Sequence, residues 1–511
     1  MNLNVPVLSE QPLIVAETRP AKITKFLSAL PVTNALETSL ALQDELEILN
    51  RQKVAPDTRI KALETYRPAV ISATESLASH YCTTALPLPE QEKQYAVIAN
   101  TLWAEIAFGY KLAVIDLEAK LFKFGSNKLL ALSLQRALDA LRMQIVIYYE
   151  TYRALPRSLW AELHQIFSLA RARDLADQEI DSGSQEREVS ISHIYKQALL
   201  LSLTDPQHLS PREIKLVCDY IMRFAHLAQL QPANNLENTA AIFLVSTGRD
   251  KPPVPLSKRL RNIDGENDLL LLTMDVARQV HLHIKQGQSG PFPPGAGLPD
   301  SANQPRYLDL LNYLLRHWGA APKRIYSRTP KNDGIELVIG LPAIHRVLSN
   351  QPATPNEDNI PVISRPLSSR WQVLNISAGG MALRKLPAAE VQVHVGDLVC
   401  IKINPTSHWA LGVLRWANHT ENRHLDIGLQ MLAPDASAIN VHSATLTSGI
   451  PMLLLPEIPV IKQTASLIGN PGSYGPAKIL DIEQEEGMQR IMITRLIERT
   501  NHFDHFQFSP L

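Results

Sequence analysis

The chain has 511 residues, 45% of them hydrophobic, and its 50 basic and 50 acidic residues give a formal net charge of zero. A chain of this length favours two or three domains, and the balanced charge excludes a protein that coats nucleic acid through a general excess of basic side chains.

Three cysteines, odd in number and far apart, indicate neither a disulfide framework nor a zinc site, and they fit a reducing compartment. The first residues lack the basic and apolar regions of a signal peptide, and the longest apolar runs are far too short to span a membrane. We therefore predict a soluble cytoplasmic protein with no membrane span.

Residues 1–285 are predicted to form a mainly helical domain, because from about residue 33 to 230 the apolar residues recur with a helical period. The expected helix starts carry capping residues or prolines: Thr33 or Asn34, then Pro56, Pro89, Ser126, Ser158 and Ser210. Ser210 gives the strongest signal, since proline occupies the first helical position and Glu213 the third. The end of this region should hold a strand at 241–245 and a helix over 267–285.

Residues 286–305 contain four glycines and five prolines, which is typical of a flexible linker. A short connecting helix should follow over 306–321, with Leu308, Leu311, Leu315 and Trp318 along one side. That apolar side must pack either on the helical domain or on the domain that follows.

After residue 321 the apolar period changes from 3.6 to 2, which predicts strands. Half a dozen short strands over 322–435 indicate a small antiparallel barrel, and a β-rich extension continues over 436–511. The predicted fold class is therefore multidomain α+β: an all-α N-terminal domain, then an antiparallel β-barrel with a β-rich C-terminal extension.

Two short motifs lie within the predicted barrel. The first is an Arg-x-x-x-Arg pair, Arg324 and Arg328, and the second is Asn375-x-Ser377-x-x-Gly380. In this order, within a run of β-like segments, they resemble the signature of PilZ domains, the bacterial receptors for cyclic di-GMP. The resemblance covers about residues 322–435.

The resemblance implies that Arg324 and Arg328 contact the phosphates and guanines, while Asn375 and Ser377 read the remaining polar edge of guanine. Guanidinium suits this ligand because it binds phosphate or the guanine edge with two hydrogen bonds and stacks on a base. Gly380 would let the backbone turn tightly beside the ligand, where a Cβ would intrude.

The chain departs from the family pattern in two ways. The gap between the motifs is long, with an insertion rich in proline and asparagine near 352–361. In addition, the second motif begins with asparagine, Asn375, at a position where the family also has aspartate. Arg365 and Arg370 form a second candidate pair, although their spacing is one residue too long and they lie very close to Asn375. We prefer Arg324 and Arg328.

The sequence offers no candidates for catalysis: it lacks a nucleophile elbow, a phosphate-binding loop, a dinucleotide fingerprint and the motifs of the enzymes that make or degrade cyclic di-GMP. His502 and His505 have a metal-like spacing, but no cysteine or carboxylate cluster accompanies them, so we expect surface histidines and no metal. The phenylalanines beside them are expected to pack in a core.

The resemblance to PilZ domains, together with the lack of catalytic motifs, leads us to expect a non-enzymatic cyclic di-GMP receptor without a cofactor. Its helical domain would bind an unidentified protein partner, and by analogy with the family its output would be motility, pilus function, surface attachment or biofilm formation. The alternative is a PilZ-like scaffold or interaction protein that no longer binds the nucleotide.

Overall fold

The computed structural model describes most of the chain, namely residues 3–119, 126–180, 189–233, 241–256, 265, 267–320, 326–349, 368–387, 389, 391–403, 408–420, 424–443, 446–459, 463–484 and 487–511. It divides into two compact units. The first comprises residues 1–84 and 88–323, and the second comprises residues 85–87 and 324–511.

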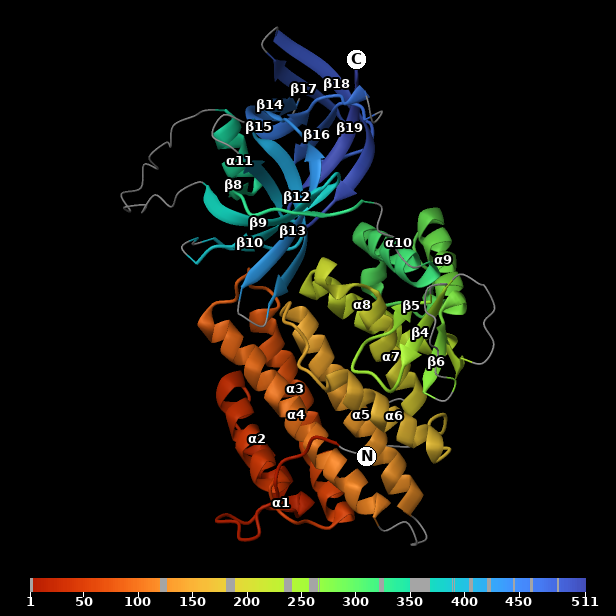
Figure 1. Ribbon diagram of the computed structural model, residues 1–511. Coiled ribbons are helices and arrows are strands. Elements are labelled where there is room, and N and C mark those ends of the chain that lie inside the picture. The colour runs from red at the N-terminus through yellow and green to blue at the C-terminus, as the bar shows by residue number, and fades with distance from the viewer. Residues whose placement is uncertain are drawn as a thin grey trace. The chain divides into compact units, whose positions relative to one another are not determined.

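Long helices make up most of the first unit, and the longest of them lie side by side (Figure 1). In chain order these helices are α1 (Pro20–Ser28), α2 (Ala35–Asn50), α3 (Pro56–Tyr81), α4 (Glu90–Glu118), α5 (Ser126–Glu150), α6 (Leu159–Ala172), α7 (Ile191–Leu203) and α8 (Pro211–Phe224). Local sequence sets several of their starts. The Asn34 side chain accepts a hydrogen bond from the Glu37 amide, and Ser210 and Glu213 form a reciprocal capping box.

The first unit also contains a four-stranded antiparallel sheet, of which only the strand at 241–245 was predicted. Its strands are β3 (Gln229–Pro232), β4 (Ile242–Ser246), β5 (Val254–Pro255) and β6 (Asp268–Leu272), in the order β3-β6-β4-β5. Two further short strands, β1 (Glu179–Ile180) and β2 (Val189–Ser190), pair with each other.

The prediction of a helix over 267–285 was wrong at its start. Asp268–Leu272 is strand β6, and helix α9 runs over Met274–Ser289. Residues Leu269 to Leu271 are almost completely buried because β6 is central and pairs with β3 on one side and β4 on the other. A run of leucines buried on both faces lacks the alternation that marks a half-exposed strand.

Helix α10 (Pro305–Gly319) corresponds to the predicted connecting helix, and it packs within the first unit. Trp318 is fully buried, its Nε1 donates a hydrogen bond to the Leu200 carbonyl oxygen at 3.1 Å, and the Thr273 hydroxyl donates to its carbonyl oxygen at 2.6 Å. The expected linker over 286–305 contains the last turn of α9 and two short 3-10 helices, η3 (Pro294–Ala296) and η4 (Asp300–Asn303). It therefore connects two helices that pack on each other.

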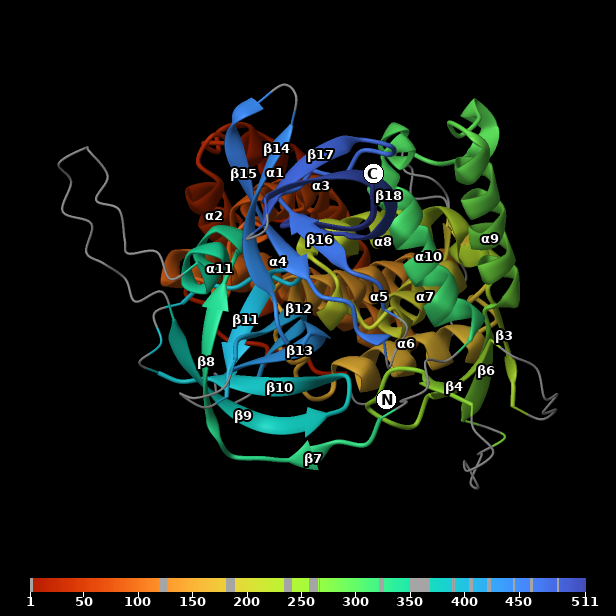
Figure 2. The ribbon, with the colours of Figure 1, turned by 90° about the horizontal axis from the view of Figure 1, so that it is seen from above.

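The second unit begins with a barrel that agrees with the predicted one. Its elements are β7 (Thr329–Pro330), β8 (Gly334–Ile339), α11 (Leu341–Leu348), β9 (Ser369–Ser377), β10 (Gly380–Lys385), β11 (Leu398–Lys402), β12 (Ala410–His419) and β13 (Leu425–Ala433). The strand order is β10-β13-β12-β11-β8-β9-β7, and β10 also pairs with β9, which closes the ring. Figure 2 shows β7 running alongside β9, the strand with which it pairs.

The β-rich extension is a second closed barrel. Its strands are β14 (Ser437–Ser443), β15 (Leu446–Leu455), β16 (Ser466–Gly469), β17 (Ile479–Gln484), β18 (Gly487–Arg499) and β19 (Asp504–Pro510), in the order β14-β15-β16-β19-β18-β17. The predicted class, a helical region followed by a PilZ-like barrel with a β-rich extension, is therefore confirmed.

The two barrels share an apolar core. Val338 and Leu398 of the first barrel and Ile344 of α11 belong to the same buried cluster as Leu453 and Phe503 of the second barrel. No helix within the described part of the chain is long and apolar enough to cross a membrane.

Candidate functional site

The second motif lies at the hairpin between β9 and β10. Asn375 and Ser377 occupy the last residues of β9, and Gly380 begins β10. Gly380 pairs with Ser377 in the ladder, and the Ser377 hydroxyl donates a hydrogen bond to the Gly380 carbonyl oxygen at 3.1 Å. The motif residues are therefore held at one edge of the barrel by a regular hairpin.

A β-bulge in β9 separates the motif from the barrel core. Trp371 and Val373 are buried, and simple alternation would bury the side chains at 375 and 377 in the same way. The register against β10 shifts between Val373 and Asn375, and both Asn375 and Ser377 are only half-buried. The bulge therefore brings the polar side chains to solvent, where they can meet a ligand.

The segment that carries the first motif runs along this same strand end. Strand β7 pairs with β9 so that Thr329 is opposite Ile376, and the same register places Arg328 beside Ser377. Arg328 is exposed, and it takes part in none of the ion pairs formed among the described residues. Its side chain is therefore accessible to an anion, on a segment that runs beside the end of β9. Arg324 lies outside the described residues.

Tyr326 and Gly379 add a second link between the two motifs. A Cβ built on Gly379 would lie 3.1 Å from Cε2 of the Tyr326 ring, so the ring rests directly on the glycine of the hairpin. Neither residue was among the predicted site residues. The only sequence feature that pointed to Tyr326 and Gly379 was their position, because each lies inside one of the two motifs.

The glycine at 380 is required by the spacing of the strands. A Cβ on Gly380 would lie 2.0 Å from the Leu429 carbonyl oxygen of β13, and the residue does not have the left-handed backbone that favours glycine. The barrel itself therefore requires a glycine here, and the predicted role of Gly380 beside the ligand stays a prediction.

The alternative arginine lies at the opposite end of β9. Arg370 pairs with Glu336 of β8, five residues before Asn375, while Arg365 is outside the described residues. A strand rises about 3.3 Å per residue, which separates the two α-carbons by roughly 16 Å. Arg328 therefore lies much closer than Arg370 to the polar end of the strand.

Other cations near the motifs already have partners. The Arg384 guanidinium binds both carboxylate oxygens of Asp426 across β10 and β13, at 2.7 and 2.8 Å. Lys331, just after β7, pairs with Asp333 at 2.8 Å. Arg328 thus differs from these neighbours in having its charge uncompensated by a described carboxylate.

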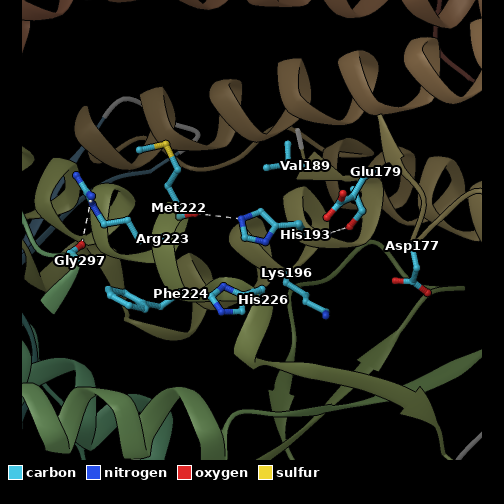
Figure 3. Close-up of a pocket in the computed structure, with 11 residues that line it drawn as sticks. Asp177, Glu179, Val189, His193, Lys196, Met222, Arg223, Phe224, His226 and Gly297 are labelled. Carbon is cyan, nitrogen blue, oxygen red and sulfur yellow. Dashed lines mark hydrogen bonds between the residues drawn. The ribbon is translucent and has the colours of Figure 1, made fainter. Parts of the chain in front are cut away.

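The first unit contains a pocket of about 520 Å³ beside α7 and α8. Figure 3 shows the rings of His193 and His226 close together in its wall, and their centroids are 6.3 Å apart. Burial lowers the pKa of His193, whose Nε2 lies 3.1 Å from the Met222 carbonyl oxygen. Lys196 and the acidic side chains of Asp177 and Glu179 also line the pocket, so its charges are mixed and do not favour a doubly anionic ligand.

The prediction that both C-terminal histidines lie at the surface was wrong for His505. That side chain is buried, and its Nε2 lies 2.9 Å from the Ser466 hydroxyl. His502 is half-buried and lies beside Asp397, with 3.1 Å between its Nδ1 and Oδ1 of the carboxylate. Phe503 and Phe506 are fully buried, as expected.

Three family models match the chain in the order of its structural regions. The N-terminal domain of the cyclic-di-GMP receptor FimW matches residues 21–234, its middle PilZ domain matches residues 242–358 and 353–438, and the FimW C-terminal beta-barrel domain matches residues 441–511. The middle model begins well before residue 322, where we predicted the barrel to start, and it includes β4, α9 and α10 of the first unit.

A curated relative, the cyclic-di-GMP receptor FimW of Pseudomonas aeruginosa, is 24% identical over an alignment of 579 positions that covers 99% of this chain and 93% of the relative. The three models and this relative agree on one arrangement along the whole chain. The protein therefore belongs to the PilZ-domain family that these three models describe.

Proposed function

We propose that this protein is a receptor for cyclic di-GMP, which it binds at the end of β9 through Arg324, Arg328, Asn375 and Ser377. The family models and the relative carry this ligand in their descriptions, which supports the proposal. Gly380 contributes indirectly, by fixing the position of the strand that follows the polar side chains.

The observation that carries the proposal is the pairing of β7 with β9. This pairing continues into the segment of the exposed Arg328 and supports a position for it next to the strand end that carries Ser377, and the contact of Tyr326 with Gly379 holds the same segment against the hairpin. A planar cation next to half-buried hydroxyl and amide groups can bind a phosphate with two hydrogen bonds while the polar groups bind the guanine edge.

Calorimetric titration with cyclic di-GMP tests the proposal. Arg328→Ala and Arg324→Ala should each weaken binding by about 2–3 kcal/mol, because each loses a charge-assisted bidentate contact. Arg370→Ala is the matched control: it removes an exposed arginine from the opposite end of the same strand and should leave the affinity unchanged.

The reverse result, with loss only in Arg370→Ala, would move the site to the alternative pair. If the correctly folded wild-type protein showed no heat of binding at all, the non-binding scaffold would be the better description of the barrel.

The proposal includes transmission to the helical unit. Trp318 is fixed in the core of the first unit, and Tyr326 follows only eight residues later along the chain. A ligand that holds Arg324 and Arg328 therefore restrains the chain directly after α10, and by linkage any state of the helical unit that favours this restraint binds the ligand more tightly.

Hydrogen exchange distinguishes transmission from simple capture. Transmission predicts that the nucleotide increases protection around 326–332 and 375–380 and also in the last turn of α10. Protection limited to 375–380 would contradict it. We place the output in motility, pilus function, surface attachment or biofilm formation, through a protein partner of the helical unit. Arg328→Ala in the host bacterium should then reproduce the phenotype of a gene deletion, whereas Arg370→Ala should not.

A further inference from the structure

Two histidines and an aspartate from both barrels converge in the second unit. The candidate ligand atoms of His394, Asp397 and His502 all lie within 4.8 Å of one another. Asp397 is at the centre: its Oδ1 is 3.1 Å from Nδ1 of His502, and its Oδ2 is 3.7 Å from Nδ1 of His394. His394 and His502 are 108 positions apart in the chain, so spacing alone could not reveal the cluster.

The turn that carries His394 and Asp397 is fixed by its backbone. The His394 amide donates a hydrogen bond to Oδ2 of Asp397 at 2.6 Å, and the Asp397 amide donates to the His394 carbonyl oxygen at 3.1 Å. Gly396 allows this turn because its φ is +95°, and the Leu414 amide donates to the Asp397 carbonyl oxygen at 2.9 Å. The carboxylate is therefore oriented before any ligand arrives.

The turn that carries His502 is equally constrained. It connects β18 to β19, and the Thr500 hydroxyl accepts hydrogen bonds from the amides of His502 and Phe503, at 3.0 and 3.1 Å. Phe503 is fully buried in the core that both barrels share. The histidine ring consequently has little freedom to leave Asp397, and it stacks against the His394 ring with 5.3 Å between centroids.

We infer that His394, Asp397 and His502 form a binding site for a divalent transition metal ion, with Zn²⁺ as the best match. Zinc binds imidazole nitrogen and carboxylate oxygen at about 2.0–2.2 Å with tetrahedral geometry, so neighbouring ligand atoms lie about 3.4 Å apart. Each histidine has a nitrogen within 3.7 Å of a different oxygen of Asp397, and one ligand atom from each of the three residues lies within 4.8 Å of the others, so a small adjustment brings them to that spacing. Mg²⁺ and Ca²⁺ fit poorly, because they require six or more oxygen ligands.

Three protein ligands leave one tetrahedral position for water or another donor. The metal would join the turn before β11 in the first barrel to the β18–β19 turn in the second. Its role is to fasten the two barrels to each other, independently of the nucleotide site at the end of β9.

The test is titration of the metal-free full-length protein with ZnCl₂ in competition with a chromophoric chelator. We expect one equivalent to bind, and His394→Ala and His502→Ala should each weaken binding by ~10-fold or more, since even the loss of an outer-shell partner costs about 10–100-fold. His408→Ala, which removes an exposed histidine of the same unit outside the cluster, should bind zinc as the wild type does.

A spectroscopic measurement and the choice of two variants guard against ambiguity. CoCl₂ should give the visible absorption bands of a four-coordinate ion in the wild type and in His408→Ala, and these bands should be lost in His502→Ala. If one alanine variant fails to fold, the other carries the test, because the two histidines lie in different barrels. Zinc bound equally well by the wild type and both cluster variants, or not bound at all, would overturn the site and leave an Asp–His ion pair.

Discussion

Gly380 at the start of β10 lies so close to Leu429 of β13 that a Cβ in place of its hydrogen would be 2.0 Å from the Leu429 carbonyl oxygen. The neighbouring backbone cannot move without opening the ladder between the two strands. We therefore expect Gly380→Ala to lower the free energy of unfolding of the second unit by about 3 kcal/mol, at the upper end of the usual cost of overpacking. Chemical denaturation of the full-length variant measures this effect.

The adjacent glycine should behave differently. A Cβ on Gly379 would meet only the ring of Tyr326, which is 54% exposed and can shift. Gly379→Ala should therefore unfold like the wild type but bind cyclic di-GMP about fivefold more weakly, equivalent to about 1 kcal/mol, because it displaces the segment that carries Arg328. If Gly379→Ala were the destabilised variant and Gly380→Ala only bound the nucleotide more weakly, the roles given to these two glycines would be wrong.

Glu150 at the end of α5 should make the first unit less stable as the pH rises. Burial raises the pKa of this carboxyl to about 7, from 4.5, and the Tyr81 hydroxyl donates a hydrogen bond to it at 3.3 Å. Between these two values the unfolded chain releases the proton while the folded protein retains it, so stability is lost as the pH rises from about 4.5 to 7.

Glu150→Gln removes this dependence while keeping an acceptor for Tyr81. Relative to the wild type, the variant should gain about 2 kcal/mol in unfolding free energy between pH 5 and pH 7.5. Denaturant titration of both proteins at the two pH values gives the difference. A gap that stays constant with pH would show that the pKa of Glu150 is the same in the folded protein as in the unfolded chain.

Lys111 of α4 and Glu162 of α6 form a buried ion pair, with 2.6 Å between Nζ and Oε2. Burial also lowers the pKa of the lysine. Lys111→Met leaves the Glu162 carboxylate buried without a cation and should cost about 3–5 kcal/mol. Adding Glu162→Leu should restore most of that loss, because no charge then remains to be desolvated. A double variant as unstable as Lys111→Met alone would mean that packing rather than charge determines the cost.

Nucleotide binding should weaken as salt is added. The guanidinium of Arg328 is exposed, and interactions between exposed charges are screened over a Debye length of about 10 Å at ~0.1 M salt. Calorimetric titrations across a range of sodium chloride concentrations test this expectation. An affinity independent of salt would indicate that stacking and base contacts supply nearly all of the binding energy.

Features set by local sequence were predictable. Asn34, Pro56 and Ser210 mark helix starts because the capping bonds involve residues only a few positions away. The barrel strands were recognised from alternating apolar residues, such as Val399 and Ile401 in β11. Strand β6 and helix α11 escaped prediction, because the first is apolar on both faces and the second lies within the long gap between the two motifs.

For the candidate site, the sequence predicted which residues take part but not how they are arranged in space. The motifs identify Arg328, Asn375 and Ser377, but no local pattern shows that a bulge turns Asn375 toward solvent or that β7 aligns Arg328 with Ser377. Both features depend on strand register: the bulge on the pairing of β9 with the adjacent β10, and the position of Arg328 on the pairing of β7 with β9, whose partners are more than forty residues apart in the sequence.

The core that joins the two barrels has a consequence for how this protein could have evolved. The middle and C-terminal family models divide the chain between residues 438 and 441, yet Leu453 and Phe503 complete a core that begins with Val338 and Leu398. A recombination event at that boundary would leave apolar side chains of both halves facing water. We therefore expect selection to have kept the two barrels together, so that homologues which lost the second one would need polar substitutions on the face of the first.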